Sequence, residues 1–96
     1  MAVRLVITIM AAPGKGADLA QAFQPRCADV MQEPGCEQFE VFQSATDPDK
    51  LLLMELWTDQ AALDAHAEMN KTRAPLPRDL FGGGNVREDY TYSRTR

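Results

Sequence analysis

The side chains best suited to chemistry are a glutamate, a tryptophan and the only histidine of the 96 residues. Glu55 and Trp57 occupy alternate positions of one apolar segment, and His66 follows in a segment with helical spacing. Imidazole titrates near neutrality, so His66 is a candidate general base. The indole of Trp57 could stack on an aromatic ligand and donate one hydrogen bond. A buried Glu55 could have a raised pKa and act as an acid or a base.

Each of these residues also has a structural interpretation. His66 could be a half-buried helix histidine with a backbone partner. Trp57 could fill core volume beneath the second helix. For Glu55 we favour an ion pair with Arg4 or Arg87 on a neighbouring strand, because a buried carboxylate needs a partner. The residues alone leave these alternatives open.

The segment 51–57 predicts a strand that is buried on both faces. Successive side chains of a strand point to opposite faces, and here both sets are apolar apart from one glutamate. One set is Leu51, Leu53, Glu55 and Trp57, and the other is Leu52, Met54 and Leu56. Such a strand requires helices on one side of the sheet and a second covering surface on the other.

The rest of the chain predicts three more strands and two helices. We expect strands at 3–10, 36–45 and 85–93 and a first helix at 17–32, which Pro25 should kink. The turn residues 46–50 should join the second and third strands in a hairpin. Asp59 is the expected N-cap of the second helix, since its carboxylate can accept the free amide hydrogens there.

Several side chains can be assigned to faces of these elements. The second helix should present one apolar side, made of Ala62, Leu63, His66, Met69 and Asn70. In the second strand, Phe39 and Val41 should face one way, and Cys36 and Phe42 the other. Cys36, beside a turn, is the better candidate for a reactive thiol. Tyr90 and Tyr92 share one face of the last strand, where we expect packing near the sheet interior or a dimer seam.

The order of elements is β-α-β-β-α-β, which predicts a ferredoxin-like α+β fold. Its four-stranded antiparallel sheet carries both helices on one face, within a single domain of residues 1–96. The other face would leave apolar residues exposed, and such a patch marks an interaction surface. A symmetric homodimer that packs sheet against sheet is the simplest closure.

Composition and charge exclude several classes of function. The net charge is −4 and the sequence contains no block of Lys and Arg, which argues against nucleic-acid binding. No apolar stretch approaches the roughly 18 residues of a membrane span. The two cysteines form neither a disulfide framework nor a metal-binding spacing, so we expect the reducing cytoplasm and no metal. The glycines at 82–84 lack the features of a phosphate-binding loop.

One stretch of the sequence resembles a known family. Residues 55–66 read E-x-W-x-D-x-x-A-L-x-x-H, preceded by Glu33-Pro34-Gly35-Cys36 and by the hairpin Asp47-Pro48-Asp49. This pattern is similar to the antibiotic biosynthesis monooxygenase-like family of the dimeric α+β barrel superfamily, over roughly the first two thirds of the chain. The resemblance implies a homodimer with a pocket between sheet and helices in each subunit. It also implies oxidation of a phenolic or quinol-type aromatic by dioxygen, without metal, flavin or other cofactor.

The resemblance also suggests site residues. Trp57 matches a pocket tryptophan and His66 the helix histidine, while the stretch 69–73 follows that histidine. The catalytic candidates are His66, Trp57 and Glu55. The substrate-binding candidates are Trp57, Phe39, Leu53, Met69 and Arg73.

Two alternatives to a monooxygenase stay open. One is a non-catalytic dimeric module that binds a small apolar molecule. The other is a haem-degrading oxygenase, which in this family uses an Asn on the first strand. The first strand here offers Thr8 in that region and no Asn.

Overall fold

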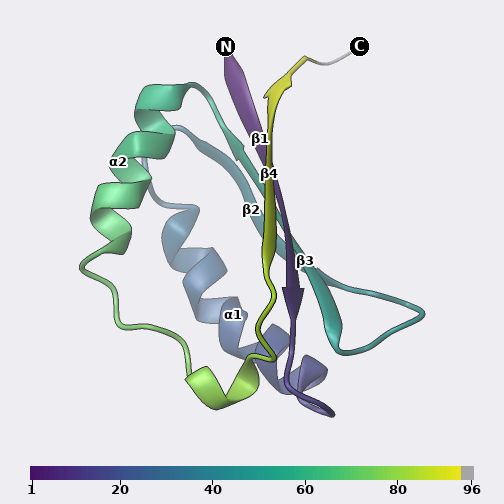
Figure 1. Ribbon diagram of the computed structural model, residues 1–96. Helices are drawn as coiled ribbons and strands as arrows, with labels where there is room; N and C mark the ends of the chain where they lie inside the picture. The colour runs from purple at the N-terminus through teal and green to yellow at the C-terminus, as the bar shows by residue number, and fades with distance from the viewer. Residues whose placement is uncertain (94–96) are drawn as a thin grey trace.

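The computed structural model describes residues 1–93, and its elements follow the predicted order (Figure 1). They are β1 (Ala2–Met10), α1 (Gly16–Val30), β2 (Cys36–Gln43), β3 (Lys50–Trp57), α2 (Gln60–Asn70), the 3₁₀ turn η1 (Arg78–Leu80) and β4 (Val86–Tyr92). The strands form one antiparallel sheet in the order β2-β3-β1-β4. Both helices lie on the same face of this sheet (Figure 1). The predicted ferredoxin-like α+β fold is confirmed.

The two central strands supply most of the core beneath the helices. Leu5 pairs with Glu55, and Ile9 pairs with Leu51, so these side chains share the helix-facing side. The hairpin between β2 and β3 brings Phe39 opposite Glu55 on the same side. The buried core beneath the helices consists of Leu5, Ile9, Ala11, Leu19, Phe23, Val30, Phe39, Leu51, Leu53, Trp57 and Leu63. This one-sided core fixes which face of each strand can reach a ligand beneath the helices.

A bulge near the start of β2 changes one predicted face. Cys36 pairs with Trp57, but Gln38 already pairs with Leu56. Two steps along β2 therefore correspond to one step along β3, which is a β-bulge. Cys36 therefore packs against the core, and its predicted position beside Phe42 is wrong. Burial, followed by the nearby carboxylates, raises the pKa of its thiol to about 11. A neutral, partly buried thiol does not match the expected reactive cysteine.

The face of the sheet that points away from the helices, called the open face, is apolar at one end and polar at the other. Phe42 and Val86 are exposed at the apolar end. At the other end Arg4 donates to Gln38 and lies 4.9 Å from the ring centroid of Tyr92. Arg4 and Gln38 flank Leu56, which is only 2% exposed although it points away from the helices. The exposed Tyr90 lies at this same end, because it pairs with Arg4. Tyr90 and Tyr92 thus belong to the open face rather than to the core.

The second helix begins where the sequence predicted. Asp59 has extended backbone angles, and its Oδ1 accepts the amide hydrogen of Ala62 at 2.8 Å. Leu63 and His66 are the buried residues of this helix, whereas Met69 is about half exposed. Two steps of three residues rotate a side chain about 120° away from Leu63, so Met69 leaves the sheet-facing side. Its predicted place on that side is wrong.

The first helix ends earlier than expected. It stops at Val30, which is fully buried, and Met31 is its exposed C-cap. Pro25 lies inside the helix. At the other end, the Asp49 carboxylate accepts the amide hydrogens of Gly14 and Gly16, at 2.9 and 3.0 Å. These bonds fix the start of α1 against the β2–β3 hairpin. No helix within residues 1–93 is long and apolar enough to cross a membrane.

The N-cap generates a prediction about α2. Asp59→Ala removes the acceptor of the Ala62 amide hydrogen, which should lower the free energy of unfolding by about 1 kcal/mol. For a domain of this size the melting temperature should fall by about 4–8 °C. Asp59→Asn keeps a capping oxygen and should retain most of the stability. Equal loss in the Ala and Asn variants, measured by thermal unfolding, would contradict the capping role.

Candidate active site

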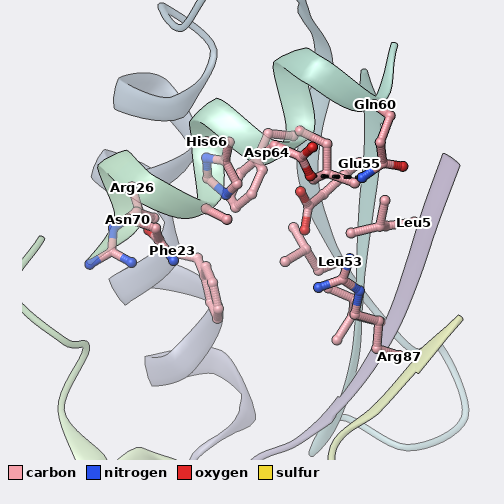
Figure 2. Close-up of a pocket in the computed structure, with 14 residues that line it drawn as sticks. Leu5, Phe23, Arg26, Leu53, Glu55, Gln60, Asp64, His66, Asn70 and Arg87 are labelled. Atoms are coloured by element: carbon pink, nitrogen blue, oxygen red, sulfur yellow. Dashed lines mark hydrogen bonds between the residues drawn. The ribbon is translucent and has the colours of Figure 1, made fainter. Parts of the chain in front are cut away.

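A cavity of about 390 Å³ lies between the helix-facing side of the sheet and the two helices (Figure 2). This volume is in the range of small-molecule sites. Its apolar walls are Leu5, Ile7, Phe23, Phe39, Leu53, Leu63 and Ala67. Its polar walls are Arg26, Glu55, Gln60, Asp64, His66, Asn70 and Arg87. The cavity therefore combines apolar surface with titratable groups at which a ligand could exchange a proton.

The imidazole of His66 is held by a buried carboxylate. Its Nδ1 lies 3.1 and 3.0 Å from the two carboxylate oxygens of Glu33, which follows α1. Glu33 Oε2 also lies 2.8 Å from Nη1 of Arg73, and Arg73 Nε donates to Asp29 at 2.9 Å. A carboxylate that faces a guanidinium offers only acceptor atoms, so the Nδ1 of His66 carries the hydrogen. The ring nitrogen left for a ligand is Nε2, which in neutral imidazole accepts a proton.

Two aromatic side chains of the sheet hold the same imidazole from the other side. The Trp57 and His66 ring centroids are 4.7 Å apart with planes tilted by 31°, and those of Phe39 and His66 are 5.8 Å apart. Trp57 is completely buried and packs behind His66, so it is not itself a wall of the cavity. The structure thus brings Trp57 and His66 together, with only the histidine facing the cavity.

Glu55 is a buried carboxyl group on the sheet side of the cavity. It is 4% exposed, and its Oε1 accepts the indole hydrogen of Trp57 at 2.9 Å. Burial raises the pKa of this carboxyl group above its ordinary value. The Trp57 hydrogen bond and the charges of His66 and Arg87 oppose that rise without cancelling it. The group is therefore more easily kept neutral than an exposed glutamate.

The predicted ion pair of Glu55 with Arg4 or Arg87 is wrong. Arg4 pairs with Leu56 in the sheet, so it points to the open face and donates to Gln38. Arg87 lies on the cavity side but donates through Nε and Nη2 to Asp89, at 2.8 Å for both contacts. Within residues 1–93, no cation comes within ion-pair distance of Glu55.

The predicted substrate-binding residues divide into two groups. Phe39 and Leu53 are walls of the cavity. Trp57, Met69 and Arg73 are not. Trp57 packs behind His66, Met69 has rotated off the sheet-facing side, and Arg73 is held by Asp29 and Glu33. The side chain of Arg73 is only 12% exposed. Arg73 contacts Glu33, and through it helps to hold His66 in place.

Glu33 is the direct partner of His66, although the sequence pattern that contains it assigned it no role. It stands immediately before the Pro34-Gly35 turn. Gly35 has φ +82° and lies against Ala62 of α2, where an added Cβ would be 2.5 Å from the Ala62 Cβ. This close approach brings the turn, and Glu33 with it, beside the second helix. Within the described residues, no group of three or more His, Cys, Asp or Glu side chains could hold a metal ion.

Comparison with known proteins identifies the class of this chain. The profile described as Antibiotic biosynthesis monooxygenase matches residues 2–74, so the chain belongs to that family. The matched region includes β1 to α2, with Glu33, Glu55, Trp57 and His66, and ends before η1 and β4. A search of curated proteins gives no significant match.

Solved structures with the same fold come from several bacteria. PA3566 from Pseudomonas aeruginosa is 25% identical with a TM-score of 0.79, and the match covers 97% of this chain and 95% of that protein. SO0527 from Shewanella oneidensis is also 25% identical, with a TM-score of 0.75 and coverage of 93% and 88%. Rv0793 from Mycobacterium tuberculosis is 20% identical, with a TM-score of 0.79 and coverage of 98% and 97%.

The contacts of Glu33 with His66 and Arg73 generate the next prediction. Glu33→Ala removes the hydrogen-bond partner of His66 Nδ1 and the ion-pair partner of the Arg73 guanidinium. Breaking such a buried contact should lower the free energy of unfolding by about 2–3 kcal/mol. The imidazole should also lose its fixed Nδ1–H form and become a mixture of tautomers, which ¹⁵N NMR of the ring resolves. Glu37→Ala, an exposed glutamate of β2, is the matched control. A single Nδ1–H tautomer in both variants would contradict the role of Glu33.

Proposed function

We propose that this protein is a cofactor-independent monooxygenase that oxidises a phenolic or quinol-type aromatic with dioxygen. Membership of the Antibiotic biosynthesis monooxygenase family supports a monooxygenase-like role. The observation that carries the finer proposal is the Glu33–His66 contact at the edge of the cavity. It leaves one basic ring nitrogen for a ligand and fixes the other.

The chemistry requires a base and a largely apolar pocket. Triplet dioxygen reacts slowly with neutral closed-shell molecules, whereas a phenolate is electron-rich enough to donate one electron to it. His66 Nε2 would remove the phenolic proton, and Glu33 would keep the imidazole in the required tautomer and orientation. Phe23, Phe39 and Leu53 would pack against the aromatic ring of the substrate. In this proposal Trp57 supports His66 from behind, because its indole hydrogen is already donated to Glu55.

We also propose that two copies pair through the open faces of their sheets. That face leaves Leu52 and Met54 partly exposed and Phe42, Val86 and Tyr90 exposed in the isolated chain. A second copy would cover these residues and leave each cavity on the far side of its own sheet. The family's dimeric members motivate the proposal, and the exposed apolar side chains support it physically.

The first functional prediction concerns His66. With a naphthol probe such as 1,5-dihydroxynaphthalene, His66→Ala should lower oxygen uptake by roughly a hundredfold, the usual scale for a positioned base. The measurement is oxygen consumption without added flavin or metal.

A matched control and a second probe make this test decisive. Glu68→Gln changes an exposed side chain of the same helix and should leave uptake unchanged. Added imidazole should partly restore His66→Ala by entering the vacated space. Unchanged uptake in His66→Ala would remove the histidine from the mechanism. Probe binding by the wild type without oxygen uptake would favour a non-catalytic binding module instead.

The second functional prediction concerns pairing. Leu52→Glu places a charge on the apolar end of the open sheet face and should convert a dimer to monomers, because an unpaired buried charge is strongly unfavourable. Sedimentation velocity across a concentration series measures the change. Gln24→Glu, on the solvent side of α1, adds the same charge elsewhere and should leave the dimer intact. A stable wild-type monomer would contradict the proposed pairing.

A further inference from the structure

We propose that Glu55 is the proton donor of the cavity and completes the reaction that His66 begins. This inference rests on the proposed function and assigns the second proton transfer to a named group. The two groups come from opposite walls, His66 from α2 and Glu55 from β3 (Figure 2). A substrate between them would meet a base on one side and an acid on the other.

The two oxygens of the Glu55 carboxyl group have different surroundings. Oε1 accepts the indole hydrogen of Trp57. Oε2 makes no hydrogen bond within residues 1–93, yet it is not sealed among protein atoms, because the residue lines the cavity. A carboxyl group with one oxygen anchored and the other open to a cavity is oriented for exchange of a proton with a ligand.

The charges that face Glu55 come from two further elements. His66 on α2 and Arg87 on β4 favour the carboxylate, and Asp89 on β4 opposes it. Arg87 is engaged with Asp89 through both of its contacts, so its charge is largely compensated. Burial outweighs these contributions, and the pKa of the carboxyl group is raised. Glu55 therefore holds its proton to a higher pH than an exposed glutamate does.

The proposed sequence balances for a phenol with hydrogen on the attacked carbon. His66 Nε2 takes the phenolic proton, the phenolate gives one electron to dioxygen, and the two radicals combine to form a carbon–oxygen bond. Glu55 protonates the outer peroxide oxygen. The carboxylate of Glu55 then removes the hydrogen of that carbon as the carbonyl forms and the oxygen–oxygen bond breaks. The departing hydroxide takes the proton from His66 and leaves as water.

The products are a quinone and one water, and both protein groups return to their starting forms. The substrate loses four electrons and dioxygen gains four. The geometry separates the two proton transfers because the phenolic oxygen and the attacked carbon lie at different positions of one ring. An acid on the β3 wall reaches the peroxide while the base on α2 stays at the phenolic oxygen.

Glu55→Gln tests this assignment with 1,5-dihydroxynaphthalene as the probe. Glutamine can still accept the Trp57 hydrogen but has no proton to transfer. Quinone formation should fall by roughly a hundredfold. Oxygen that is still consumed should appear as hydrogen peroxide, because the carbon–oxygen bond of the unprotonated adduct breaks to give back the phenoxyl radical and superoxide. Two superoxide ions and two protons then give hydrogen peroxide and dioxygen. Glu68→Gln makes the same chemical change on the solvent side of α2 and should match the wild type.

A pH profile distinguishes proton donation from a merely structural role. Wild-type quinone formation should decline at high pH as Glu55 loses its proton, and Glu55→Gln should lack this decline. Trp57→Phe removes the hydrogen bond that lowers the pKa of Glu55, so its decline should move to higher pH. This variant keeps Glu55 and provides the test if Glu55→Gln does not fold. Infrared spectra should show the neutral carboxyl stretch in the wild type and Trp57→Phe.

The outcomes separate this inference from the proposed function. A hundredfold loss of quinone with peroxide release, or the shifted decline in Trp57→Phe, supports Glu55 as the donor. Unchanged quinone yield in Glu55→Gln, or an unshifted decline in Trp57→Phe, overturns the inference and leaves the oxygenase intact. No oxygen uptake by the wild type with the probe overturns the proposed function and this inference together.

Discussion

Burial of β3 is the constraint on which the rest of the molecule depends. This strand has β1 and β2 on its two edges and buried side chains on its helix-facing side. The helices must cover Leu51, Leu53 and Trp57, and this fixes both helices to one face of the sheet. Trp57, the last residue of β3, stacks on His66. This contact positions α2 through the side chain that faces the cavity. Packing of the core and placement of the candidate base are therefore the same contact.

The two buried carboxyl groups near His66 have opposite environments. Glu33 faces a guanidinium and an imidazole nitrogen, so its surroundings match a negative charge. Glu55 has an indole donor and no ion-pair partner within the described residues, so burial dominates and its pKa rises. Two carboxyl groups in different surroundings can take different roles in one site. Glu33 is placed to hold His66 as a carboxylate, and Glu55 is placed to carry a proton. Here the separation follows from position, since one group lies behind the histidine and the other across the cavity from it.

Local patterns predicted the fold, the hairpin and the Asp59 cap because each depends on residues close in sequence. What they missed depends on register and on contacts between elements. The bulge that turns Cys36 toward the core is visible only from the pairing of β2 with β3. Glu33 meets His66 because Gly35 lets a turn approach α2, and no spacing links the two positions. The preferred partner of Glu55 was wrong for the same reason, since strand register directs Arg4 to the other face.

The edge strand β4 has a further consequence for how this fold can diversify. Its cavity-side residues Arg87 and Asp89 are exposed, contribute nothing to the buried core and pair with each other. They lie outside the residues matched by the family profile, which ends at 74. Substitutions there would cost little stability, because exposed ion pairs contribute little. The polar groups at this margin of the cavity can therefore change while the packing that holds His66 stays unchanged, so that the chemistry of the cavity edge can vary without a new fold.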